Sequence, residues 1–420
     1  MDKNTILTYT KHIGTYFSAS LIPMILNLVS NPFIAMNMAP RDYAIVGYYS
    51  SFTSLVQPLI IFYMVQYYLR NYFNVTSEER IKLRATVFKA LLGYSMFMTV
   101  LCYIGISTYI HLFNPSIEFP IFPYLALTLL PIPLTGIYQM QTADYRMEKK
   151  TKAFFNIHVT YAVIQIALNL LFVVLIKWGA FGKLLAPLIT NFIFFSYVLY
   201  KNREYLMIKV DKKDFISLMS FCWPLALGAM LGYFTGGYDK TYLESLKDTT
   251  TYGNYIVASQ MAGYIHVFTG AVGSTFQPDV YQAIMKGWKS RLIKTYAVQL
   301  GVILFVVIVY ILLCPYIIGI LTAGRYVDAT PFSRVIAFST FASALYFNIN
   351  GYTICKGYPM IYTITTAVGS LVIIGLMPLM ITKFQFFGAA YMTSISYLIL
   401  SVINVVLLLF IRYKKQLLNK

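Results

Sequence analysis

The sequence predicts an all-α integral membrane protein with twelve transmembrane helices arranged as two six-helix lobes. Three observations lead to this prediction. Only 11% of the 420 residues are charged, whereas a soluble domain has about 25%. Hydrophobic residues make up 58% of the chain, and the mean hydropathy is +0.65. The few charged residues also divide the chain into twelve long uncharged runs, with most of the basic residues falling between alternate runs.

The uncharged runs have the length of membrane-spanning helices. Crossing the hydrocarbon layer takes about 20 helical residues, and eleven of the twelve runs are long enough. The sixth has 17 residues and becomes sufficient if Lys183 extends to the interface. Membrane-spanning strands would be about half as long and would alternate in polarity, unlike the continuously apolar residues 302–313. The runs are 13–40, 43–69, 90–117, 119–143, 153–176, 184–200, 215–238, 249–278, 295–324, 335–355, 357–382 and 384–411.

The basic residues predict the orientation of these helices. Of the 33 lysines and arginines, 25 lie on the side that contains both termini and 8 on the other. Because basic residues concentrate in cytoplasmic loops, both termini are expected in the cytoplasm. The net charge of +18 then comes mostly from basic residues of the cytoplasmic loops, which face anionic lipid. No nucleic-acid partner is implied. The four cysteines lie in apolar runs and the four histidines are scattered, so no metal or cofactor is expected.

The two halves of the chain resemble each other. We expect an N-terminal lobe over 1–200, a cytoplasmic linker over 201–214 and a C-terminal lobe over 215–420. Each half opens with a proline-containing helix, at Pro23 and Pro224, that ends in a charged outer loop. A helix rich in Tyr, Ser and Thr follows in each half and ends near Gln-Pro, over 42–58 and 251–278. Six spans per half make this a parallel repeat, an arrangement found in transporters.

The second helix of the C-terminal half is unusually polar. Close packing through small residues explains its glycines. It explains the polar side chains less well, and a face lining a water-filled cavity is the alternative. These side chains are Asn254, Gln260, His266 and Gln277.

Residues 224–263 resemble a stretch found in lipid-linked oligosaccharide flippases. In that family the seventh helix ends in an acid followed by a base, here Asp239–Lys240, and a Gly-x-Tyr follows, here Gly253 and Tyr255. Residues 324–335 also resemble the family pattern. The family is the polysaccharide transporter branch of the multidrug/oligosaccharidyl-lipid/polysaccharide exporter superfamily.

This resemblance implies a flippase for an undecaprenyl-pyrophosphate-linked oligosaccharide repeat unit of an O-antigen, capsule or exopolysaccharide. It would work by alternating access in the bacterial cytoplasmic (inner) membrane, as a monomer and without enzymatic catalysis. Membrane lipids, and a polysaccharide polymerase with assembly proteins, are the implied partners. Lipid II flippases carry arginines in the first helix, and residues 20–36 contain none, which argues against lipid II as the cargo.

A pyrophosphate cargo requires a polar, cationic chamber, because desolvating an isolated anion costs tens of kcal/mol. The candidate binding residues are Lys240 with Asp239 as its partner, Arg41 in the first-half counterpart Arg41–Asp42, Arg334, Asn254, Gln260 and Gln277. Candidates for coupling to a H⁺ or Na⁺ gradient are Asp279 and His266. For each charged candidate the alternative is an ordinary helix end at the interface, and for His266 it is a structural role.

Two other classes of function would require features that the sequence lacks. A multidrug or cation exporter of the same superfamily needs a carboxylate deep in a lobe, but all fifteen acids lie outside the uncharged runs. A membrane glycan polymerase needs a long basic outer loop, and the longest one here has two lysines. An acyltransferase needs a buried histidine with a charged neighbour, which His266 lacks in the sequence. Both classes are therefore disfavoured.

Overall fold

A computed structural model describes residues 22–418 apart from 73–74, 114–117, 149 and 357. Within these residues the chain is helical throughout and contains no strand. In hydrocarbon, every backbone N–H and C=O group needs a partner inside the protein, and a helix provides these partners locally. The predicted all-α membrane fold is confirmed, and the chain is a multi-pass membrane protein.

Seven of the described helices are long and apolar enough to cross a membrane. All twelve uncharged runs are mainly helical over the residues that can be described. The exact number of spans remains a prediction, because several runs consist of shorter helices placed end to end.

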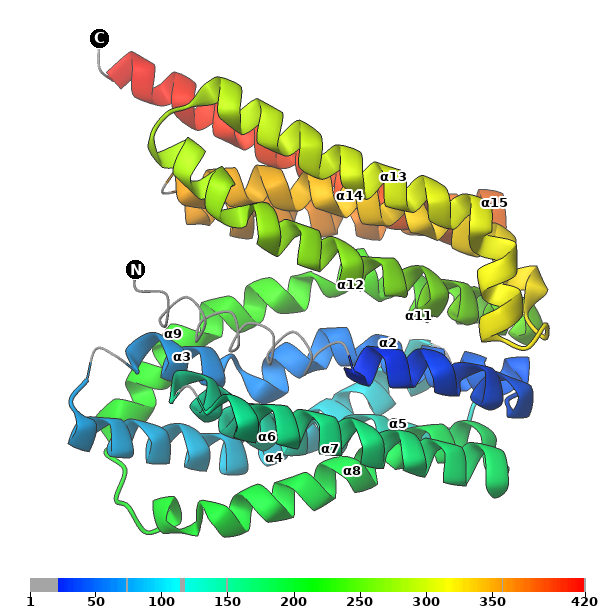
Figure 1. Cartoon of the computed structure of the whole chain (residues 1–420), viewed down its shortest axis with the longest axis horizontal. Helices are drawn as coiled ribbons and strands as arrows, with labels where there is room; N and C mark the ends of the chain where they lie inside the picture. Colours follow the sequence, from blue (N-terminus) through cyan, green and yellow to red (C-terminus); the bar gives the residue numbers. More distant parts are fainter. Residues whose placement is uncertain (1–21, 73–74, 114–117, 149, 357, 419–420) are drawn as a thin grey trace, which may run out of the picture. The chain divides into compact units, whose positions relative to one another are not determined.

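The chain divides into two compact units, and Figure 1 shows the helices of each lying side by side. Unit 1 extends to Met230 and includes Leu321–Ala323; unit 2 comprises Leu231–Ile320 and Gly324–Lys420. The helices of unit 1 are Ile22–Asn37, α2 (Pro40–Ile61), α3 (Met64–Asn71), α4 (Ser77–Phe113), α5 (Tyr124–Leu129), α6 (Pro131–Met147), α7 (Thr151–Asn169), the π-helix η1 (Leu170–Leu175), α8 (Gly179–Lys201), the 3₁₀-helix η2 (Arg203–Leu206) and most of α9 (Lys212–Leu231).

Unit 2 contains the remaining helices, among which α12, α14 and α15 pack together. They are α10 (Tyr233–Gly236), α11 (Tyr238–Leu243), η3 (Glu244–Leu246), α12 (Thr249–Met285), α13 (Lys289–Leu321, whose last residue belongs to unit 1), η4 (Val327–Ala329), α14 (Thr330–Cys355) and α15 (Pro359–Leu418).

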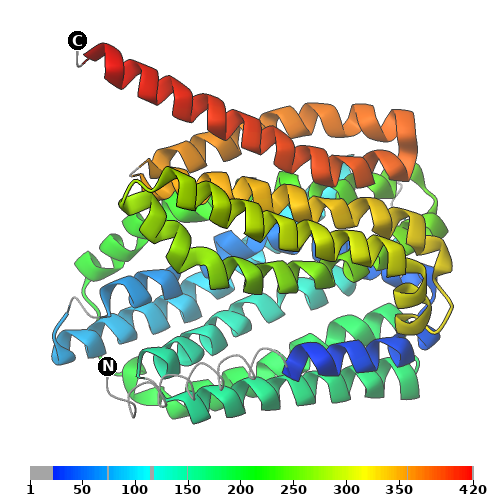
Figure 2. The same cartoon turned by 45° about the horizontal axis from the view of Figure 1, so that its top comes forward.

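Helix α15 is two helices joined at a sharp bend. Gln385 has a left-handed φ of 50° with a ψ of −132°, which no helix contains. Figure 2 shows the segment before the bend, in orange, returning as the red C-terminal segment. Gly388 allows the close approach, because a Cβ there would collide with the carbonyl oxygen of Met380. The break coincides with the single charge, Lys383, that separates the last two uncharged runs.

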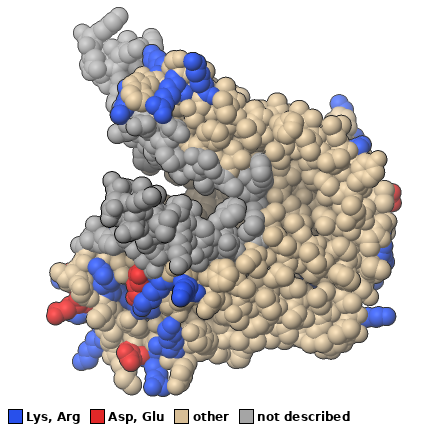
Figure 3. All heavy atoms as spheres, viewed as in Figure 1, with Lys and Arg blue, Asp and Glu red and all other residues tan. Residues whose placement is uncertain are grey.

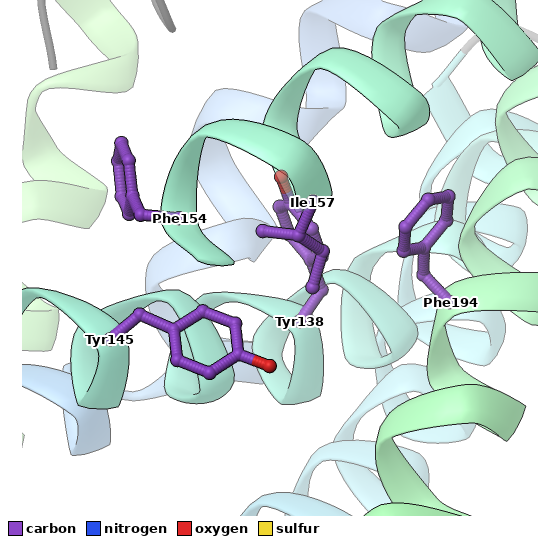
Figure 4. Packing of buried hydrophobic residues seen from close by; sticks show 5 residues of the cluster. All are labelled: Tyr138, Tyr145, Phe154, Ile157 and Phe194. Atoms are coloured by element: carbon purple, nitrogen blue, oxygen red, sulfur yellow. The ribbon is translucent and has the colours of Figure 1, made fainter. Parts of the chain in front are cut away.

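In unit 1, an aromatic cluster holds α6, α7 and α8 together (Figure 4). Tyr138 stacks in an edge-to-face manner on Phe194, with ring centroids 5.7 Å apart, and its hydroxyl lies 3.1 Å from Nδ1 of His158. Phe154 and Ile157 of α7 belong to the same cluster. Full burial of a side chain of this size, relative to its exposure to water, contributes about 1.5–3 kcal/mol to the free energy of folding.

A buried ion pair joins four segments of unit 1 near the ends of their helices. Arg84 of α4 pairs with Asp144 of α6, whose Oδ1 accepts a 2.6 Å hydrogen bond from the hydroxyl of Tyr68. Arg84 also donates to Oδ1 of Asn202 and to the hydroxyl of Tyr205, both at 2.8 Å. Because the guanidinium and the carboxylate are both multiply bonded, their burial is compensated. Charges near helix ends are also seen on the face of the molecule shown in Figure 3. Its charged side chains lie towards the helix ends, with a broad uncharged band between them.

Candidate functional site

Two adjoining cavities lie within unit 1, and both are lined by uncharged polar side chains. The first, of about 260 Å³, is lined by Ser54, Gln57, Pro58, Ile61, Tyr63, Gln66 and Gln139. The second, of about 280 Å³, is lined by Ser50, Thr53, Gln57, Ile61, Leu127, Thr128, Pro131, Ile132, Thr135, Leu184, Pro187 and Asn191. Gln57 and Ile61 line both cavities, so the two lie next to each other at this turn of α2.

Interrupted helices surround these cavities. Helix α2 ends at Phe62 and Tyr63, two consecutive residues with φ of 53° and 54°. The left-handed region is unfavourable for residues that carry a side chain, and such strain concentrates at functional sites. Prolines at the cavity wall, including Pro58 inside α2 and Pro187 inside α8, remove further helical hydrogen bonds. The wall therefore departs from regular helix at the depth where the cavity lies.

The polar groups of the wall divide into satisfied and unsatisfied ones. Asn191 is held in place, because its Oδ1 accepts from the hydroxyl of Thr135 at 2.9 Å and its Nδ2 donates to the carbonyl of Pro187 at 2.9 Å. The side-chain amides of Gln57, Gln66 and Gln139 make no hydrogen bond to any residue that the structure describes. No Lys, Arg, Asp or Glu is among the described lining residues of either cavity.

Sequence reasoning missed these cavities. It noted the Gln-Pro ending of residues 42–58 only as a sign of duplication, and Gln57 is that glutamine. Gln66 and Gln139 carry no signal of their own, because only the packing of α6 against α2 and α3 brings them to one cavity.

Asp239 lies in unit 2 and is buried, with 4% of its surface exposed. It lies in the first turn of α11, the last part of a helix broken twice, because α9 is followed by the short α10 and, after Gly237, by α11. Such discontinuous helices form ion and substrate sites in transporters. Its Oδ2 accepts a 2.6 Å hydrogen bond from the hydroxyl of Tyr255 on α12, and its Oδ1 has no hydrogen-bond partner in the described part of the chain.

The predicted pairing of Lys240 with Asp239 is wrong. Tyr255 is the partner of Asp239, and no ion pair joins the two neighbouring charges among the described residues. Successive residues on a helix point about 100° apart, so the side chains diverge. Lys240 is half-buried, and its carbonyl accepts from the hydroxyl of Tyr252 at 2.9 Å. Its ammonium has no partner among the residues that the structure describes.

The first-half counterpart, Arg41–Asp42, makes contacts that stabilise the fold. Asp42 joins two helix starts: its Oδ2 accepts from the backbone N–H of Ala39 at 2.8 Å, and its Oδ1 accepts from that of Ala180 at 2.9 Å. The carboxylate thus compensates unpaired N–H groups and the positive ends of α2 and α8. Gly179 has a φ of +51°, and a Cβ there would collide with this carboxylate. Arg41 is exposed and donates to the carbonyl of Glu118 at 3.4 Å.

Arg334 is exposed on α14 and reaches the backbone of α13. Its Nε donates to the carbonyl of Ile311 at 3.1 Å. That carbonyl lacks its helical partner because residue 315, four positions on, is a proline without an N–H group. The arginine therefore compensates a proline in a neighbouring helix, a role that its own sequence context does not reveal.

The other predicted site residues lie on α12. Asn254 and Gln260 are half-buried, and Nε2 of Gln260 lies 3.5 Å from the hydroxyl of Tyr264. His266 is exposed. The side chains of Gln277 and Asp279 lie outside the described part of the structure. Of the predicted binding residues that the structure describes, Arg41 belongs to unit 1 and the others to unit 2.

We predict that replacing Arg334 by alanine lowers the thermal midpoint of the detergent-solubilised protein, because the Ile311 carbonyl loses its donor. A hydrogen bond from a charged donor contributes about 1.5–3 kcal/mol. In a Pro315→Ala background, the restored backbone N–H takes over this carbonyl, and the same arginine substitution should lower the midpoint much less. Equal losses in both backgrounds would show that Arg334 acts elsewhere.

The comparisons with known proteins agree on the fold. The family model described as "Polysaccharide biosynthesis protein" matches residues 33–331. No curated protein matches the sequence closely enough to count as a relative. Solved structures similar to this one include the lipid II flippase MurJ in an inward closed conformation, with a TM-score of 0.73 and 15% identity over 94% of this chain and 87% of that chain.

Two further similar structures are transporters of the MOP superfamily. An inward-facing MATE family transporter of the MOP superfamily has a TM-score of 0.69 at 15% identity, over 96% of this chain and 98% of that one. A MOP superfamily transporter from Pyrococcus furiosus has a TM-score of 0.57 at 14% identity, over 98% and 96%. At these identities the structural matches establish the fold. The family model covers well over half of the chain, and the chain therefore belongs to the polysaccharide biosynthesis protein family.

Proposed function

We propose that this protein moves a lipid-linked oligosaccharide repeat unit across the bacterial cytoplasmic membrane by alternating access. The observation that carries the proposal is the pair of adjoining cavities in unit 1, whose walls carry amide and hydroxyl groups inside a bundle of membrane helices. A chain in a polysaccharide biosynthesis family needs such groups to take a sugar through oil, because sugar hydroxyls without partners cost several kcal/mol each. The undecaprenyl-pyrophosphate carrier and the O-antigen, capsule or exopolysaccharide glycan belong to this proposal.

The cargo's pyrophosphate requires a cation, and Lys240 is our candidate. It is half-buried in unit 2, and its ammonium has no partner in the described residues. A hydrogen bond to a charged group contributes about 1.5–3 kcal/mol. Both termini then lie in the cytoplasm, and the flipped unit passes to a polymerase and assembly proteins outside.

A cation or drug exporter is a weaker candidate. Binding an organic cation at membrane depth requires a carboxylate to offset its desolvation. No acid is among the described lining residues of either cavity.

Depletion of the protein should trap lipid-linked repeat units on the cytoplasmic leaflet, measured by their resistance to an externally added, membrane-impermeant glycosidase or lectin. Lys240→Ala should reproduce most of this defect at a normal protein level, with the rate of export reduced about tenfold or more. Lys383→Ala is the matched control, because Lys383 is an exposed lysine of the same unit. Normal export in depleted cells would refute the function; normal export with Lys240→Ala alone would remove only this lysine from the site.

We further propose that a H⁺ or Na⁺ gradient drives the cycle and that Asp239 binds the ion, in place of Asp279 or His266. Its free Oδ1 and its burial support this assignment. Asp239→Asn keeps an oxygen for the Tyr255 hydroxyl but removes the charge. In membrane vesicles, transport of the glycan should lose its response to the ion gradient. Asp248→Asn is the control, since this exposed acid only caps α12. A retained gradient response in Asp239→Asn would contradict the assignment.

A further inference from the structure

Three glutamines in unit 1 form a group that packing alone does not explain. Gln57 comes from α2, Gln66 from α3 and Gln139 from α6, and all three line the same cavity of about 260 Å³. None of their side-chain amides bonds to a residue in the described part of the chain. Gln57 and Gln66 are exposed and Gln139 is half-buried, so each amide is accessible from the cavity. Three amides from three helices, each with open hydrogen-bonding groups, can therefore bond to a ligand or to water in this one cavity.

The chemistry of the wall selects the ligand. A primary amide offers two N–H donors and a carbonyl acceptor, which matches neighbouring hydroxyl groups that both donate and accept. Ser54, in the same wall, adds a hydroxyl. The described wall contains no cation to compensate a phosphate or a carboxylate, and burying an uncompensated anion is prohibitive. A neutral polyhydroxylated molecule fits this wall, and an anionic one does not.

The size of the cavities sets how much of the ligand each accepts. Sites for drug-sized ligands have volumes of about 300–1,000 Å³. The glutamine cavity, at about 260 Å³, is below this range, as is its neighbour at about 280 Å³. Each therefore suits one or two sugar rings. Gln57 lines both, so it is placed to bond at the junction between consecutive residues of a glycan.

We propose that Gln57, Gln66 and Gln139 form a subsite in unit 1 for the uncharged sugar hydroxyls of the cargo. This inference rests on the proposed function and refines it, because it assigns the glycan to the neutral cavity and leaves the pyrophosphate to another part of the protein. Asn191 and Thr135, which bond to each other at 2.9 Å, form a fixed polar edge in the adjoining cavity. The three glutamines are the groups free to bond to the sugar.

The test uses the full-length protein in detergent micelles, with binding of soluble disaccharides followed by saturation-transfer NMR. The neutral probes are lactose and N,N′-diacetylchitobiose, the anionic probe is a disaccharide containing a uronic acid, and inorganic pyrophosphate is a further ligand. We expect saturation transfer to the neutral probes and little to the uronate. Gln57→Met and Gln139→Met keep the side-chain volume but remove the amide, so each should weaken neutral-sugar binding about fivefold, and the double variant by more than tenfold.

Gln165→Met is the matched control, because Gln165 is a half-buried glutamine of α7 outside both cavities. It should bind the sugars as the unmodified protein does. Pyrophosphate binding should be unaffected in all variants. Absence of transfer to both neutral probes, equal binding by the glutamine variants, or binding of the uronate as strong as that of neutral sugar would each overturn the subsite. The depletion experiment would still report on flipping, so loss of the subsite and loss of the proposed function remain distinguishable.

Discussion

The structure is governed by one constraint: a polar group at membrane depth has no bulk water to bond to, so the protein must supply its partner. Helices satisfy this for the backbone, and the exceptions are compensated one by one. Asp42 takes the free N–H groups at the starts of α2 and α8. Arg334 takes the carbonyl that Pro315 leaves free. Arg84 and Asp144 compensate each other and bind the segment that follows α8.

The groups without a partner in the protein are therefore informative. In unit 1 they are neutral amides, exposed or half-buried, around two adjoining cavities, whose wall is broken by the strained pair Phe62–Tyr63 and by prolines. In unit 2 they include one oxygen of the buried Asp239. The chemistry differs accordingly: unit 1 offers hydroxyl recognition without charge, whereas unit 2 offers an acid and an unpaired lysine. A cargo with a neutral glycan and an anionic linkage needs both kinds of group.

The sequence was sufficient to predict the fold class, because charge is so costly in hydrocarbon that its absence marks helices almost directly. Even the bend of α15 is marked, by Lys383. The site was not predictable in the same way. The site residues predicted from the sequence are mainly charged residues near helix ends. Their partners come from distant segments, such as Ala180 for Asp42, which the sequence does not reveal. The signal of Gln57 next to Pro58 is visible in the sequence; the convergence of Gln66 and Gln139 on it depends on helix packing.

The central claim is that the glutamine cavity holds water and sugar at membrane depth. Replacing the four native cysteines and introducing Gln57→Cys tests it directly, through reaction with a small, charged, membrane-impermeant thiol reagent in inside-out vesicles. We predict rapid labelling at position 57, slowed by added neutral disaccharide, and none at a Gln165→Cys control. Position 57 as unreactive as position 165 would mean that the wall is dry and that the cavity does not hold water or sugar.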